Sequence, residues 1–209
     1  MIEPAGKRVL HVGCGFPAPG KLNPVFHGDG WREVRLDIDP DVEPDIVGSI
    51  TDLSAVPDGW ADAIWSSHNI EHIHDHEVPL ALAEFRRVLR PDGFVLITCP
   101  DLDLAARMLV DLGPEKTIMV TGDERLPVTP LDIIFGGRIQ VARGRTYMAH
   151  RIGFTAETLG AAIARAGFGD VNVRRGNMID LWALAWRSGP IRDPDLLSRA
   201  VSAPVIYQG

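Results

Sequence analysis

The stretch Val9-Leu10-His11-Val12-Gly13-Cys14-Gly15 decides how this chain is organised. An apolar run that ends in Gly-x-Gly predicts a buried strand followed by a tight turn. Asp37 comes directly after the next strand candidate, residues 31–36. This layout is typical of nucleotide binding, because the glycines let a ligand approach the backbone closely and the acid can accept hydrogen bonds from ribose hydroxyls.

The rest of the chain alternates between strand-like and helix-like patterns. Apolar residues recur at helical spacing from Val78 to Leu89, with Asp75 as the expected N-cap, and again after Thr155, the expected N-cap of a second helix. Residues 102–112 also have a helical pattern. The further runs that predict strands are residues 45–50, 61–66, 94–98, 171–173 and 179–186.

This alternation predicts a doubly wound α/β fold in three layers, with helices on both faces of a mostly parallel sheet. Only residues 175–177 separate the last two strands, which favours an antiparallel pair at the end of the sheet. We expect a single domain over residues 1–209, with an insertion or lid at about 113–153. The proline-rich stretch from about residue 188 predicts an extended tail.

Composition excludes several classes of protein. The 209 residues are 45% hydrophobic and carry a net charge of -7, which argues against a nucleic-acid partner. No apolar run is long enough to predict a membrane helix. Two cysteines, Cys14 and Cys99, cannot form a disulfide framework. Residues 1–16 lack the pattern of a secretory signal, so we expect a cytoplasmic protein.

The loop after Gly15 bears on which nucleotide would bind. A dinucleotide needs a helix directly after the glycines, because the helix N-terminus holds the pyrophosphate. Pro17, Pro19 and Pro24 oppose such a helix, so a ligand without phosphate suits the loop better than NAD. An NAD-dependent oxidoreductase is therefore the less favoured reading.

An ordered set of motifs resembles one family. The opening stretch is similar to the first motif of class I S-adenosylmethionine-dependent methyltransferases, and Leu36-Asp37-Ile38-Asp39-Pro40 is similar to the second. Residues 61–72, 85–94 and 166–168 resemble later motifs, in the right order. The resemblance points to methyltransferase type 11-like proteins, a bacterial group of predicted methyltransferases. It implies a Rossmann-like fold and an S-adenosylmethionine cofactor.

The resemblance also implies roles for individual residues. The backbone of the glycine turn would lie against the methionine part of the cofactor, Asp37 would hold the ribose, and Ile38 would pack on the adenine. Ser66 and His68 would lie near the transferring methyl group. The cofactor-binding residues implied in this way are Gly13, Cys14, Gly15, Asp37, Ile38, Ser49, Ile50 and Ser66.

Two residues depart from the family pattern. His11 stands where the family usually has an acid, and Ser49 stands where an acid usually contacts the adenine. These departures leave open a non-catalytic member of the family that binds the cofactor, or has lost it, and serves as a partner protein.

No catalytic base can be singled out from spacing. The candidates are His68, Glu71, His72, Asp101 and His150, and methyl transfer requires mainly alignment of the reacting atoms. The histidines at 68, 72, 74 and 76 suggest metal binding, but no third ligand follows at a zinc-site spacing. From the sequence we therefore expect no metal.

The expected acceptor is a small molecule that is methylated on oxygen or nitrogen. Residues 66–69 lack the signature of amino-methylating DNA enzymes. Residues 136–151 contain four arginines and no acid, and arginine is suited to binding carboxylate or phosphate. We therefore expect His68, Arg145 and Arg151 to contact an acceptor that is anionic. The sequence leaves the oligomeric state open.

Overall fold

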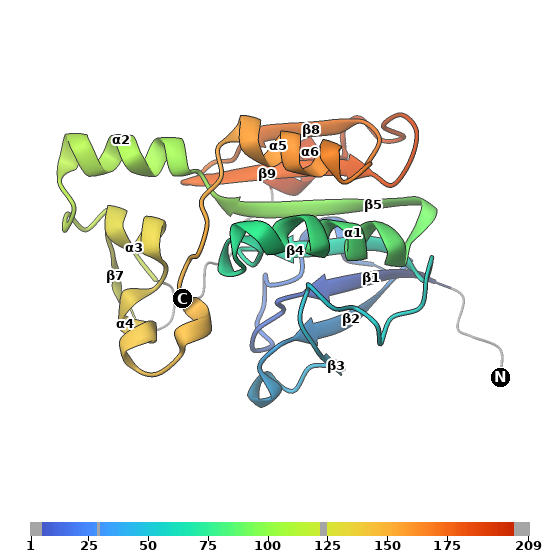
Figure 1. Cartoon of the computed structure of the whole chain (residues 1–209), viewed down its shortest axis with the longest axis horizontal. Coiled ribbons are helices and arrows are strands. Elements are labelled where there is room, and N and C mark those ends of the chain that lie inside the picture. The colour runs from blue at the N-terminus through green and yellow to red at the C-terminus, as the bar shows by residue number, and fades with distance from the viewer. Residues whose placement is uncertain (1–5, 29, 122–124, 203–209) are drawn as a thin grey trace.

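The computed structural model describes residues 6–28, 30–121 and 125–202. A seven-stranded sheet with the order β3-β2-β1-β4-β5-β9-β8 forms its centre (Figure 1). The first five of these strands are parallel, and β9 pairs antiparallel with both β5 and β8. The strands are β1 (Lys7–Val12), β2 (Trp31–Asp37), β3 (Ile46–Val47), β4 (Ala61–Ser67), β5 (Leu89–Pro100), β8 (Val171–Arg175) and β9 (Asp180–Trp186).

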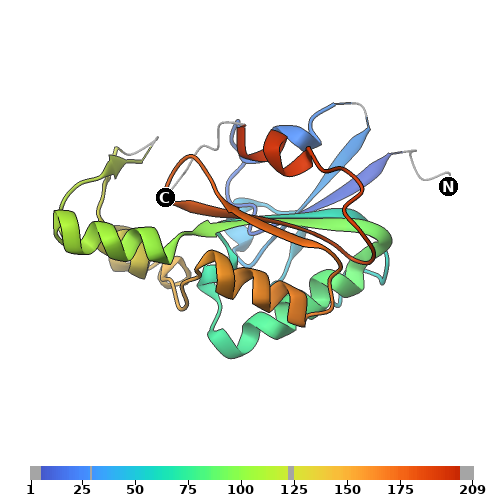
Figure 2. The same cartoon turned by 90° about the horizontal axis from the view of Figure 1, so that it is seen from above.

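Helices cover both faces of this sheet, which confirms the three-layer α/β fold (Figure 2). On one face α1 (Val78–Val88) and α5 (Ala156–Arg165) cover a core that includes Leu82, Phe85 and Ile163. On the other face α6 (Leu196–Ser202) packs beside the short 3-10 helix η1 (Pro24–Phe26). The core there is aromatic, and it is built from Phe26, Trp31, Trp65, Phe94, Trp182 and Trp186.

The helix α6 corrects one expectation from the sequence. The tail after residue 188 was expected to be extended, but Leu196, Leu197, Ala200 and Val201 are buried on the sheet. Apolar residues at helical spacing can form a helix that buries them against the sheet, even where a proline-rich stretch precedes them. Residues 203–209 lie outside the described part of the chain.

The connections after β1 and β2 contain little helix, as the prolines after Gly15 indicated for the first of them. Between β1 and β2 the described residues contain only η1, and between β2 and β3 only the 3-10 helix η2 (Pro40–Val42). The N-cap expected at Asp75 is wrong, because Asp75 begins another 3-10 turn, η4 (Asp75–Glu77), and Glu77 is the N-cap of α1. Thr155 does cap α5, accepting a hydrogen bond from the Thr158 backbone N–H.

The segment 113–153 follows α2 (Leu102–Leu112) and lies beyond the carboxyl ends of the parallel strands (Figure 1). It contains a small hairpin and three short helices, so it is less irregular than its glycines and prolines suggest. These elements are β6 (Met119–Val120), β7 (Pro127–Val128), α3 (Pro130–Phe135), α4 (Arg138–Ala142) and the 3-10 helix η5 (Thr146–Met148). Among the described residues there is no helix of the length and apolarity that a membrane span requires.

Candidate functional site

A cavity of about 600 Å³ lies between the carboxyl ends of β1, β2 and β4 and the segment 113–153. This volume falls within the range of about 300–1,000 Å³ that is typical of small-molecule sites. In an open parallel sheet, ligands bind at the carboxyl ends of the strands, next to the place where the strand order reverses. Here that place lies between β1 and β4, which are neighbours in the sheet.

The glycine turn forms one wall of the cavity, and its backbone needs glycine. Gly13 and Gly15 have φ values of +62° and +60°. A β-carbon on Gly13 would also lie only 2.5 Å from Cγ of Asn69. Both residues line the cavity, so the turn presents bare backbone to whatever occupies it.

Asp37 fixes this turn from the end of β2. Its Oδ2 accepts a hydrogen bond from the Gly15 backbone N–H at 2.8 Å, and its Oδ1 accepts one from the Asp39 N–H at 3.0 Å. A carboxylate has about four lone-pair sites, so capacity remains for further donors such as hydroxyls. Asp37 is nearly buried yet lines the cavity.

The next wall is apolar. Ile38 lines the cavity with 59% of its surface exposed, and an exposed isoleucine beside a hollow is suited to packing against a flat ring. Ile50 and Ser49 line the cavity as well. The Ser49 hydroxyl is hydrogen-bonded to the Thr51 hydroxyl at 2.8 Å.

Two residues expected at the site do not line it. Cys14 is 2% exposed, and burial raises the pKa of its thiol to about 11, so the thiol is neither accessible nor ionised. Ser66 is fully buried, whereas its neighbour Ser67 lines the cavity. Successive side chains of a strand point to opposite faces, which places Ser66 on the face of Ile64, under α1.

His11 lies behind the glycine turn and is paired with a carboxylate. Its Nδ1 is 2.6 Å from Oε1 of Glu33 on the neighbouring strand β2. His11 is 1% exposed, and burial lowers its pKa against the opposing effect of Glu33. An acid is therefore present next to position 11, although it comes from a different strand.

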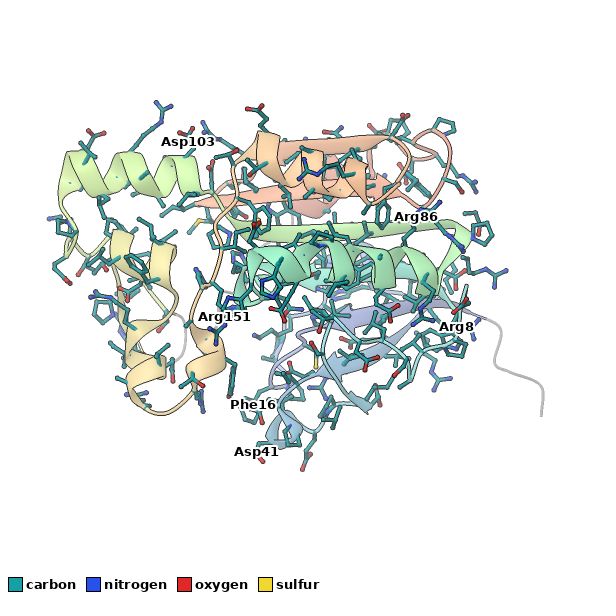
Figure 3. The ribbon with its side chains drawn as sticks, in the orientation of Figure 1. Arg8, Phe16, Asp41, Arg86, Asp103 and Arg151 are labelled. Carbon is teal, nitrogen blue, oxygen red and sulfur yellow. The ribbon has the colours of Figure 1, made fainter. Side chains whose placement is uncertain are left out.

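The segment 113–153 closes the cavity from the opposite side. The Tyr147 hydroxyl donates a hydrogen bond to Oδ2 of Asp39 at 2.7 Å, which joins η5 to the end of β2. Burial and this hydrogen bond raise the pKa of Tyr147 to about 12. Arg145 lines the cavity, but Arg151 is exposed and does not, contrary to expectation. In Figure 3 Arg151 lies beside the chain that leads into α5.

The candidate bases separate into two groups. His68, His72 and His150 line the cavity around the buried carboxylate of Glu71. His68 Nδ1 is 3.5 Å and His150 Nε2 is 3.9 Å from Glu71 Oε1. Burial opposes ionisation of Glu71, but the nearby imidazoles of His68, His72 and His150 outweigh it and lower the pKa of Glu71.

Asp101 belongs to a different environment and has a structural role. It caps α2, accepting hydrogen bonds from the backbone N–H groups of Asp103 and Leu104, and it accepts another from Nε of Arg175 at 2.6 Å. It does not line the cavity, so the structure removes it from the candidate bases.

Comparison with known proteins shows which family part of the chain resembles. A family model described as a methyltransferase domain matches residues 10–97, which carry the glycine turn, Asp37 and the end of β4. The match covers less than half of the chain, so these residues are similar to a methyltransferase domain, in agreement with the motifs of the sequence. This similarity supports methyl transfer in general terms. A search of the curated proteins found none that matches this sequence.

Solved methyltransferase structures share the fold at low sequence identity. A SAM-dependent methyltransferase from Archaeoglobus fulgidus is 17% identical, with a TM-score of 0.56, over 87% of this chain and 86% of that one. One from Methanosarcina mazei is 16% identical, with a TM-score of 0.53, over 87% and 92%. The 1,6-didemethyltoxoflavin-N1-methyltransferase of Burkholderia thailandensis, solved with its substrate and S-adenosylhomocysteine, is 16% identical, with a TM-score of 0.53, over 88% and 72%.

Several residues that line the cavity of this chain were not predicted from the sequence. Ser67 and Asn69 lie within the quoted motif of residues 61–72, but spacing did not distinguish them from their neighbours. Phe16, labelled in Figure 3 beyond the carboxyl end of β1, lines the cavity with half of its surface exposed. Apart from its position among arginines, no sequence pattern indicated that Tyr147 lines the cavity, because its hydrogen-bond partner Asp39 is distant in sequence.

Proposed function

We propose that the cavity binds S-adenosylmethionine and that the protein transfers its methyl group to a small molecule. The backbone of Gly13 and Gly15 would meet the methionine part, Asp37 the ribose, and Ile38 with Ile50 the adenine. One observation carries the proposal most of all: Asp37 holds the glycine turn at 2.8 Å and still borders the cavity. The adenine edge would meet Ser49.

The remaining residues of the cavity suit transfer by alignment. Ser67 ends β4, the strand that pairs with β1, and His68 and Asn69 follow it, so these residues would surround the methyl group and the acceptor. The donor is a sulfonium that is already activated, so positioning accounts for much of the rate, and a histidine can take the acceptor's proton. We infer an oxygen or nitrogen acceptor on this ground. The Burkholderia enzyme, solved with a small-molecule substrate, offers a precedent.

Segment 113–153 would act as a lid over the acceptor within the single domain. Its contact with Asp39 through Tyr147 supports this role, because opening the cavity there would break one hydrogen bond. Closure would exclude water from the transferring methyl. We place the reaction in the cytoplasm, since Cys14 and Cys99 are both free thiols, which a reducing compartment preserves.

The acceptor that we propose is anionic, and Arg145 is the residue that would bind it. Arg138 also lines the cavity, but it is neutralised by Glu115 at 3.0 Å and Asp132 at 2.9 Å. Arg145 instead contacts a neutral side chain, with its Nη1 3.4 Å from Oε1 of Gln140. A guanidinium in that position can form a bidentate pair with a carboxylate.

The test is a methyl-transfer assay with matched acceptors, each carboxylate being compared with its neutral amide. We expect turnover with carboxylates, and we expect Arg145→Met to raise KM for them at least tenfold while cofactor affinity is unchanged. Arg151→Met is the matched control and should behave as wild type. A preference for the amides would contradict the anionic acceptor. Cofactor binding without turnover of any acceptor would favour the non-catalytic alternative.

A further inference from the structure

Glu71 is a buried carboxylate whose surroundings leave its charge incompletely balanced. It is 1% exposed. Within the described part of the chain neither carboxylate oxygen has a hydrogen-bond partner of normal geometry. The shortest ion-pair distance to it is the 3.5 Å from His68 Nδ1. An ionised carboxylate is costly to bury unless a positive group lies close to it, so this position favours a cation.

Two histidines beside Glu71 are held in a tautomer that leaves Nε2 free to bind a metal. His72 Nδ1 is 3.2 Å from the carbonyl oxygen of Ala149, and His150 Nδ1 is 2.9 Å from that of Ile133. A carbonyl oxygen can only accept a hydrogen bond, so Nδ1 carries the proton and Nε2 keeps its lone pair. Metal-binding histidines are commonly oriented by such a second hydrogen bond.

The three side chains also converge on one point. One carboxylate oxygen of Glu71 and one ring nitrogen each of His72 and His150 lie within 4.8 Å of one another. Glu71 and His72 belong to the 3-10 helix η3 (Ile70–His72). His150 lies near the end of the segment 113–153. The Glu71 carbonyl oxygen accepts backbone hydrogen bonds from Arg151 at 2.8 Å and Ile152 at 3.3 Å, so the fold holds the two segments together.

We propose that Glu71, His72 and His150 bind one divalent transition-metal ion of the zinc type. Two imidazoles and a carboxylate are a known ligand set for zinc with an open fourth position, whereas Mg²⁺ prefers oxygen ligands alone. His72 and His150 line the cavity and Glu71 does not. The open position therefore faces the cavity, where it would hold water or an oxygen atom of a bound molecule.

The sequence around residues 68–76 offers no third ligand at a zinc-site spacing, which is why no metal was expected. The fold supplies that ligand as His150, which is remote in sequence, so spacing could not reveal it. The exposed pair His74 and His76, with ring centroids 5.6 Å apart, is the competing place for adventitious binding. It lies outside the converging set and provides a matched control.

The experiment measures metal binding alone and so does not depend on methyl transfer. The full chain, prepared without a histidine tag and stripped with chelator, is titrated with Zn²⁺ and separately with Mg²⁺, and the bound metal is counted by elemental analysis. We expect one zinc per chain and no binding of Mg²⁺ at the same concentrations. Glu71→Gln and His150→Ala should each weaken zinc binding at least 100-fold, and His74→Ala should leave it unchanged.

Circular dichroism of each variant checks that it is folded. Glu71 is the more deeply buried ligand, so His150→Ala provides the decisive comparison if Glu71→Gln does not fold. Absence of zinc binding by the wild type would overturn the proposal, as would binding that survives in folded His150→Ala. Zinc that is lost in His74→Ala would show a surface site instead. Calorimetry with S-adenosylhomocysteine on the metal-free protein separates failure of this inference from failure of the proposed function.

Discussion

Asp37 shows how much one side chain can determine at this site. Its two oxygens accept backbone hydrogen bonds from Gly15 and Asp39, and the same carboxylate borders the cavity. Asp39, two residues later, has a different role, because it binds Tyr147 of the opposite wall. Substitutions of these two acids should therefore have different effects on cofactor binding.

Asp37→Asn should weaken S-adenosylhomocysteine binding by about 1.5–3 kcal/mol, the range for hydrogen bonds to a charged group. The substitution keeps the size of the side chain and removes the charge that would hold the ribose hydroxyls. Asp39→Asn should change cofactor affinity much less, since its amide oxygen still accepts a hydrogen bond from Tyr147. Calorimetry measures both. Equal losses in the two variants would show that the wrong carboxylate is assigned to the ribose.

At the residue scale, Gly13, Gly15 and Asp37 line the cavity, as a cofactor-binding role requires, and that role stays a prediction. Ser66 does not line the cavity. The sequence could not show this, because β4 is buried on both faces and therefore lacks the alternation that distinguishes inward from outward side chains.

At the scale of elements, Arg87 joins α1 to the loop that precedes β4. Its guanidinium donates to the carbonyl oxygens of Leu53 at 2.9 Å and Val56 at 3.0 Å, and to Glu84 at 2.7 Å. These contacts join the helix to carbonyl groups of the loop, of which the Leu53 carbonyl oxygen also accepts a hydrogen bond from the Val56 backbone N–H at 2.8 Å. The loop leads from the Ser49–Ile50 wall of the cavity, so Arg87 supports the site indirectly.

We expect Arg87→Met to lower the free energy of unfolding by about 1.5–3 kcal/mol, because its charge-assisted hydrogen bonds to Glu84 and to the loop carbonyls are lost. Arg90→Met is the matched control. Arg90 is about half exposed, and its contact with Asp62 is 3.5 Å, so its loss should cost less than about 1 kcal/mol. Urea denaturation measures both variants. Similar values for the two would contradict the role given to Arg87.

Element boundaries were predictable where capping chemistry is local. The bounds of α2 match the helical pattern of residues 102–112, and Thr155 caps α5 as expected. The start of α1 was not predictable, because the turn of η4 uses the same acidic residues that usually cap a helix. The third strand is shorter than the predicted run of residues 45–50 and spans only Ile46–Val47. It lies at the edge of the sheet, where short strands are common.

At the scale of the whole molecule, α6 completes the second helical layer. Leu196, Leu197 and Val201 pack with the aromatic core under the sheet. The Asn23 side chain donates to the carbonyl oxygen of Ala200 at 3.1 Å, so α6 is also tied to the loop between β1 and β2. That loop begins with the glycine turn.

Leu197→Ala should therefore destabilise the protein by about 2–4 kcal/mol, the usual cost of a cavity in a core. Arg199→Ala, on the exposed side of the same helix, removes only a surface ion pair with Asp193 and should cost less than about 1 kcal/mol. Thermal and urea unfolding give the comparison. Wild-type stability in Leu197→Ala would mean that α6 is not part of the core.

The sequence predicted the order of strand and helix patterns and the antiparallel end of the sheet, because these follow from local periodicity and loop length. It did not predict which remote segments meet. The contact of Tyr147 with Asp39 and the approach of His150 to Glu71 depend on how segment 113–153 folds over the strand ends. No local pattern encodes that placement.

The central claim is that the cavity at the strand ends binds S-adenosylmethionine. Calorimetry of the full chain with S-adenosylmethionine, S-adenosylhomocysteine and NAD, each titrated separately, tests it most directly. We predict one-to-one binding of both adenosyl ligands and none of NAD, because the described residues directly after Gly15, 16–23, form no helix that could hold a pyrophosphate. Absence of binding by both adenosyl ligands, or tighter binding of NAD than of either, would contradict the account.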